Sequence, residues 1–190
     1  MDIDSSVIHV LQEMTRIPAA LKAWRTPVLD LLNDNRIFNC TPEDANKWRS
    51  IVRAIYDSDK TALPELLGKE FQVVKFDITT YNFSAKVAAT PSTNIFTTRE
   101  YEMLLRSLSL RRLSYAIFAS EKNHFLTQLP TIQERLVDVF RNVPSPIVQS
   151  EVFLCIRVLL CRLSANNLTS LWPVVLTEMV FLEQYIFESS

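Results

Sequence analysis

The chain has 190 residues, a formal net charge of −1 and a single glycine, Gly68. Sandwiches, doubly wound sheets and phosphate-binding loops need glycines at their turns, so this composition excludes most α/β enzyme folds and favours an all-α protein. With 48% apolar and 22% charged residues, the sequence predicts one globular domain over residues 1–190, and its near-zero net charge gives no basic footprint for nucleic acid.

The cellular compartment is predicted from the first residues, from the length of the apolar runs and from the number of cysteines. The first residues, Met-Asp-Ile-Asp, are acidic where a secretory signal is basic, and no run of about 18 apolar residues could span a bilayer. Three cysteines, Cys40, Cys155 and Cys161, cannot all pair. We therefore expect a cytoplasmic protein whose cysteines act as small reduced hydrophobes.

Three amphipathic helices are predicted in the first 60 residues. The first covers residues 5–17 and the second residues 19–32, where Pro27 should introduce a kink or mark the effective start. Thr41 followed by Pro42 and two acidic residues is a strong start signal for the third helix, which should continue to about Tyr56.

The middle of the chain is harder to interpret. A short helix over residues 63–67 is predicted to end at Gly68 in a left-handed C-cap. Residues 71–93 form an irregular insert whose aromatic and β-branched residues follow neither helical nor alternating spacing. A short strand or hairpin and a long packed loop are both compatible with this segment.

Four further helices are predicted in the second half. A capping box, Thr97 to Glu100, begins a helix that runs to about residue 119, and an amphipathic helix follows Leu129-Pro130. The segment 145–163 begins with an N-cap serine and a proline and is apolar on nearly every side, which predicts a buried central helix. A last helix starts near residue 167. About seven helices with short connections indicate an antiparallel stack, an α-solenoid-like fragment of the HEAT or armadillo kind.

Two arginines interrupt the predicted central helix. Burial of a lone guanidinium is prohibitive, so we expect Arg157 to pair with a carboxylate of a neighbouring helix. The candidate carboxylates are Glu134, Glu151 and Glu178. The predicted structural core is Trp172, Phe153, Leu160, Arg157 and Leu136.

No motif for chemistry is present. Walker, Gly-x-Ser-x-Gly and dinucleotide-binding patterns are absent, and His9 and His124 have no cysteine or carboxylate at metal-ligand spacing. We therefore predict no catalytic, cofactor-binding or metal-binding residues and no cofactor. An enzyme with a noncontiguous site would need a deep pocket that holds several converging ionisable groups.

Two candidate interfaces remain. Arg106, Arg111 and Arg112 lie in one leucine-rich helix, where they are either a solvated face or a basic strip for acidic partners or anionic lipid. The basic strip leads to the alternative function, a peripheral membrane-binding module. The last helix carries more apolar residues than one core face needs, which indicates an interface at Phe181, Leu182, Tyr185 and Ile186.

Four blocks on successive predicted helices resemble the C-terminal region of the Dopey family. The similarity is close from about residue 97 to residue 180 and weaker over residues 21–56, around Lys-Ala-Trp-Arg at 22–25. The blocks are residues 117–121 (Ile-Phe-Ala-Ser-Glu), 129–137 (Leu-Pro-Thr-Ile-Gln-Glu-Arg-Leu-Val), 149–154 with 157–164, and 168–173 (Leu-Thr-Ser-Leu-Trp-Pro) with Thr177-Glu178.

The resemblance implies a non-enzymatic scaffold in endosome-to-Golgi traffic and cell morphogenesis. Dopey proteins are large, so this chain would be a C-terminal fragment or a truncated gene model. The implied partners are an Arf-exchange-factor-like scaffold and a phospholipid flippase, with self-association as a homodimer. The implied location is cytoplasmic and peripheral on Golgi and endosome membranes.

Overall fold

The structure, a computed structural model, describes residues 4–69, 93–143, 145–169, 171–173, 175–177 and 179–180. Every regular element in these ranges is a helix, so the predicted all-α class is confirmed. The predicted insert at 71–93 lies outside the described residues, apart from the first residue of α5.

The N-terminal half contains four α-helices and two short 3-10 turns. Their bounds are α1 (Ser5–Thr15), the turn Pro18–Ala20, α2 (Leu21–Asn33), the turn Asn35–Asn39, α3 (Pro42–Ser58) and α4 (Ala62–Lys69). The start signal of α3 is confirmed, since the Thr41 hydroxyl accepts the Asp44 N–H at 3.2 Å and Pro42 is the first helical residue. Pro27 lies inside α2 and does not mark its start.

Gly68 does not end α4 in the predicted way. It lies within the helix and its φ is not positive, so the left-handed C-cap is wrong. The helix needs no glycine at this point, because a Cβ built on Gly68 would have no atom within 4 Å.

Replacing Gly68 by alanine should therefore raise the free energy of unfolding by about 0.5–1 kcal/mol. Alanine loses less backbone entropy on folding than glycine and has the better helix propensity. Chemical denaturation of both proteins measures the change. A loss of stability would show that Gly68 leaves the helical region in solution.

The C-terminal half begins with the longest helix, α5 (Thr93–Ala119), followed by α6 (Leu129–Asn142), α7 (Pro146–Arg162) and the short α8 (Ala165–Leu168). Helical residues continue through the described parts of 171–180. An N-cap has a non-helical backbone, yet Thr97 lies in the second turn of α5, so the predicted capping box does not begin this helix.

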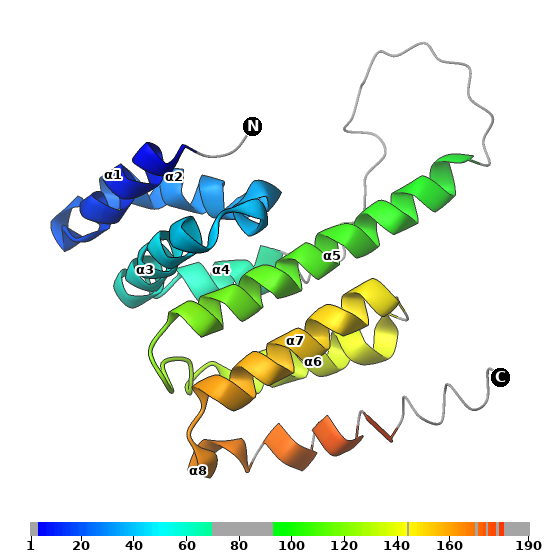
Figure 1. Cartoon of the computed structure of the whole chain (residues 1–190). Helices are drawn as coiled ribbons and strands as arrows, with labels where there is room; N and C mark the ends of the chain where they lie inside the picture. The colour runs from blue at the N-terminus through cyan, green and yellow to red at the C-terminus, as the bar shows by residue number, and fades with distance from the viewer. Residues whose placement is uncertain are drawn as a thin grey trace.

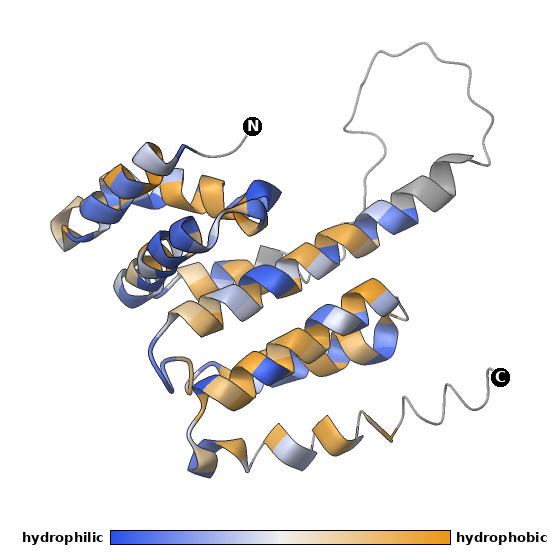
Figure 2. Ribbon diagram, in the orientation of Figure 1, coloured by the Kyte–Doolittle hydropathy of each residue, from blue (hydrophilic) through white to orange (hydrophobic). Residues whose placement is uncertain are grey.

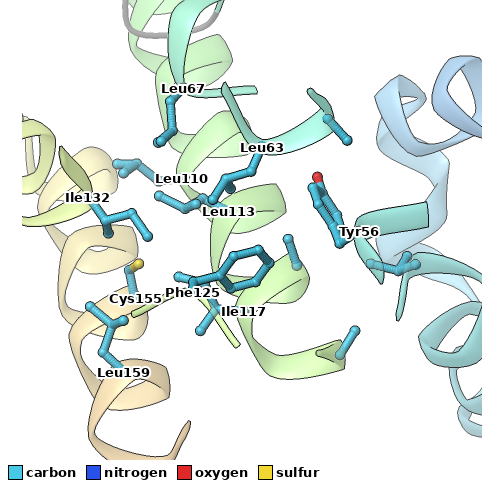
Figure 3. Packing of buried hydrophobic residues seen from close by; sticks show 14 of the residues in the cluster. Tyr56, Leu63, Leu67, Leu110, Leu113, Ile117, Phe125, Ile132, Cys155 and Leu159 are labelled. Carbon is cyan, nitrogen blue, oxygen red and sulfur yellow. The ribbon is translucent and has the colours of Figure 1, made fainter. Parts of the chain in front are cut away.

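Helix α5 separates the two halves of the molecule (Figure 1). It packs against α3 and α4 on one side and against α7 on the other, while α6 packs against α7. Figure 3 shows side chains from both halves meeting around Leu110, Leu113 and Ile117 of α5. The core therefore runs through the whole stack, and α5 is its shared wall.

Helix α7 has the predicted bounds but not the predicted central position. Its inner residues, such as Val152 and Cys155, are buried, whereas Arg157 is exposed and makes no ion pair with any described residue. The predicted pairing of Arg157 with Glu134 or Glu151 is therefore wrong, and Glu178, the third candidate, lies outside the described residues. Most of the α7 ribbon is coloured hydrophobic in Figure 2, yet Ile147 and Leu154 on this helix are exposed. An apolar helix is buried only where neighbours cover every side.

The predicted core residues divide in the same way. Leu136 is buried, and Phe153 and Leu160 are half-buried and pack against the core. Trp172 is 44% exposed, so its assignment to the core is wrong, as is that of Arg157.

Candidate protein-interaction site

The last described segment carries a stripe of exposed large apolar side chains. Trp172, Leu176, Met179 and Val180, here called the C-terminal stripe, have exposed fractions of 44%, 57%, 48% and 54%. Their i, i+4, i+7, i+8 spacing places them on one side of a helical segment. Contiguous exposed apolar residues of this kind mark interaction sites more often than scattered single ones.

The opposite side of the same segment holds it against the protein. Leu171 and Val175 are buried, and together with residues of α6 and α7 they line a small hollow. The residues from the two helices are Gln133, Leu136, Val137, Phe140, Val152 and Ile156. The segment therefore has an apolar inner face that fixes it in place and an apolar outer face that faces solvent.

A junction around Asn123 connects the loop after α5 to the start of α8. Asn123 has a φ of 65°, a left-handed conformation that asparagine tolerates better than most residues. Its N–H donates to the Arg162 carbonyl at 2.9 Å, and its Oδ1 accepts the Ser164 N–H at 2.8 Å and the Asn167 amide at 3.3 Å. These bonds set the direction in which the chain continues toward the stripe. The sequence signal was only an isolated asparagine between two helices.

The three arginines of α5 do not form the predicted basic strip. Arg111 donates to Glu151 of α7, whereas Arg112 donates to the Leu32 carbonyl at 3.0 Å and the Asn33 carbonyl at 2.6 Å, at the end of α2. The two side chains therefore bind opposite halves of the molecule. Arg106 is half-buried and makes no ion pair with a described residue.

Glu151, which pairs with Arg111, is the most buried acid in the described ion pairs. Glu151 is only 5% exposed, and its Oε1 accepts the Arg111 Nε at 3.0 Å. The hydrogen bond to Glu151 raises the pKa of Arg111, and the guanidinium also lies 5.5 Å from the centre of the Phe38 ring. The ion pair between α5 and α7 therefore has its acid, Glu151, on α7. The sequence predicted the reverse, with Arg157 of α7 bound to an acid of a neighbouring helix.

A groove opens in the N-terminal half between α2, α3, α4 and α5, here called the α2–α5 groove, with a volume of about 520 Å³. Arg25, Asp30, Glu65 and Arg112 line it, so ionisable groups do converge there. No histidine, cysteine or serine is among the lining residues. No sequence motif marks this groove, because its walls come from four separate helices.

The other predicted features are placed as follows. The candidate interface residues Phe181, Leu182, Tyr185 and Ile186 lie outside the described residues. The described residues hold no group of three or more side chains that could bind a metal, and none of the helices they form is long and apolar enough to cross a bilayer. All three cysteines are free, and burial raises the pKa of Cys155 to about 12.

Comparisons with known proteins give a consistent family. The family model described as DOP1 C-terminal matches residues 1–190. The chain is 39% identical over 160 residues to a protein DOP1 homolog of Drosophila pseudoobscura pseudoobscura, 32% over 172 residues to protein pad-1 of Caenorhabditis elegans, and 30% over 172 residues to protein DOP1B of Mus musculus. These matches cover 84%, 90% and 90% of this chain.

The relatives are far longer than this chain, which spans about 6% of the length of each of the three. None of their names indicates an enzymatic activity. No solved structure matches the chain.

Proposed function

Because the chain belongs to the Dopey (DOP1) family, we propose that it is a non-enzymatic protein-interaction module of a trafficking scaffold, and that it self-associates through the C-terminal stripe. The proposed setting is endosome-to-Golgi transport and cell morphogenesis, on the cytoplasmic side of these membranes. An Arf-exchange-factor-like scaffold and a phospholipid flippase are the proposed partners, as the family resemblance implies.

The observation that carries the proposal is the exposed C-terminal stripe. A tryptophan with neighbouring leucine and methionine side chains is typical of the anchors at the centre of protein interfaces. Two copies of one stripe can meet about a two-fold axis and cover each other, which closes the assembly as a dimer. The buried inner face of the same segment supports this role because it presents the stripe on a fixed backbone.

The membrane-binding alternative has less support. It requires the arginines of α5 to share a solvent-exposed face. Instead, Arg111 binds a carboxylate of α7 and Arg112 binds a carbonyl group at the end of α2. Such a strip would also have to attract anionic headgroups with the single remaining guanidinium of Arg106. At about 1 kcal/mol per charge, that attraction is weak.

Light scattering tests the proposal. The wild-type chain should have the mass of two chains of 21.9 kDa at micromolar concentration. The double variant Trp172→Ser/Leu176→Ser should have the mass of one chain, because it removes two apolar anchors from the stripe. Circular dichroism of the variant should retain the helical signal.

A matched control comes from the outer face of α7, where Ile147 is 57% exposed and Leu154 is 37% exposed. The double variant Ile147→Ser/Leu154→Ser should keep the mass of two chains. A wild-type chain that stays monomeric would refute self-association. A stripe variant that remains dimeric would place the interface elsewhere.

A further inference from the structure

The α2–α5 groove has the size of a ligand site. Its volume of about 520 Å³ falls within the range of roughly 300–1,000 Å³ that is typical of binding sites in proteins. It lies in the N-terminal half, on the other side of α5 from the helices that hold the C-terminal stripe (Figure 1). A function for the groove would therefore be separate from self-association.

Part of the groove wall is apolar, and this part continues onto an exposed surface. Leu29 of α2 and Leu66 of α4 line one side, and Tyr101 and Leu105 of α5 line the other. Tyr101 is 53% exposed and Leu105 is 37% exposed, and the adjacent Leu104 is exposed as well. An open groove that merges with an exposed helix face suits a peptide segment better than a small molecule, since a small-molecule site encloses most of its ligand.

The charges in the groove leave a carboxylate free for a ligand. Arg25 is already bound to Asp59 and, at 2.8 Å, to Glu65, and these hydrogen bonds raise the pKa of its guanidinium. Arg112 is bound to the carbonyl groups at the end of α2. Asp30 is exposed, lines the groove and makes no ion pair with any described residue.

We propose that the α2–α5 groove binds an amphipathic peptide segment of a partner protein that is apolar on one face and carries lysine or arginine. The apolar side chains would pack on Tyr101 and Leu105, and the cationic side chain would lie beside Asp30. Arg25 is paired with acids and Arg112 donates to groups of the protein, whereas Asp30 has no described cation beside it, so a cationic side chain gains more here than an acidic one.

Two synthetic helical peptides of about four turns test the proposal, one built from leucine and lysine and the other from leucine and glutamate with the same apolar face. Fluorescence anisotropy of the labelled peptides measures their binding to the full chain. The lysine peptide should bind at least about tenfold more tightly than the glutamate peptide. Equal affinities for the two peptides would overturn the proposal.

Matched variants locate the binding. Leu105→Ser should weaken binding of the lysine peptide by about tenfold or more, whereas Leu154→Ser on α7, at the same 37% exposure, should leave it unchanged. Asp30→Asn should reduce the preference for lysine, and Glu134→Gln, an exposed carboxylate on α6, should not. If Leu105→Ser binds as the wild type does, the peptide lies on another surface and the proposal fails. Because the Trp172→Ser/Leu176→Ser variant should bind the peptide normally, a failure here is distinguishable from a failure of self-association.

Discussion

Replacing Trp48 by alanine should lower the free energy of unfolding by about 3–5 kcal/mol, whereas the same change at Trp172 should lower it by less than about 1 kcal/mol. Trp48 is fully buried on α3, which packs against α1 and α5, so its removal leaves a cavity that the surrounding helices cannot fill. Trp172 already faces solvent, and its removal opens no cavity.

Urea denaturation of both variants measures the difference, with the midpoint and the slope fitted separately. Trp48→Phe serves as a control. The indole N–H of Trp48 has no hydrogen-bond partner, so phenylalanine should recover much of the lost stability. Equal losses at Trp48 and Trp172 would mean that the C-terminal segment turns its tryptophan inward. Dimer formation would have to be suppressed by dilution, because self-association also stabilises the folded chain.

Replacing Arg111 by methionine should lower the free energy of unfolding by about 3 kcal/mol. The change leaves the Glu151 carboxylate buried between α5 and α7 without a cation, which is the costly way to break such a pair. The value lies at the lower end of the range for buried pairs because the Arg111 side chain is itself partly exposed to solvent.

The double variant Arg111→Met/Glu151→Leu distinguishes an unpaired charge from lost packing. Replacing both charges with apolar groups should recover most of the stability lost in Arg111→Met, since an ion pair in a protein interior is often replaceable by well-packed side chains. A urea melt of the wild type, Arg111→Met, Glu151→Leu and the double variant completes the double-mutant cycle. A double variant as unstable as Arg111→Met would show that the contact of the guanidinium with the Phe38 ring, and not its pairing with Glu151, accounts for the loss.

Much of the helical architecture could be predicted from local signals. The single glycine predicted the all-α class, and the Thr41-Pro42 and Ser145-Pro146 sequences marked the starts of α3 and α7 correctly. Such signals act within one turn of a helix, so they do not depend on the rest of the fold. The predicted left-handed C-cap at Gly68 was wrong because glycine can adopt the left-handed conformation but can equally lie inside a helix.

The identity of the central helix could not be predicted, because polar serines on the buried side of α5 interrupt its apolar pattern. Ser107, Ser109 and Ser114 are buried, and each hydroxyl donates to a carbonyl of the preceding turn: Leu104 at 2.7 Å, Leu105 at 2.9 Å and Leu110 at 2.9 Å. A serine satisfied in this way is small enough for another helix to approach closely. The nearly continuous apolar pattern of α7 therefore predicted that α7 would be the central helix. Neighbouring helices cover only part of its surface, so some of its apolar side chains remain exposed.

The surfaces depend on long-range packing and were only partly predictable. The predicted interface residues of the last helix lie outside the described residues, and the exposed C-terminal stripe includes Trp172, which was assigned to the core. The roles of Arg111 and Arg112 depend on partners 40 and 80 residues away in the sequence. The α2–α5 groove has no local signature at all, since each of its walls is an ordinary amphipathic helix.

Native-state hydrogen exchange tests most directly whether α5 is the shared wall that holds the two halves and both surfaces in place. Amides between Leu108 and Ala119 should be the slowest in the chain and should exchange only through global unfolding, because these residues are covered by α3 and α4 on one side and by α7 on the other. If the slowest amides instead lie in α7 while those of α5 exchange through local opening, α7 is the centre of the fold and α5 is peripheral.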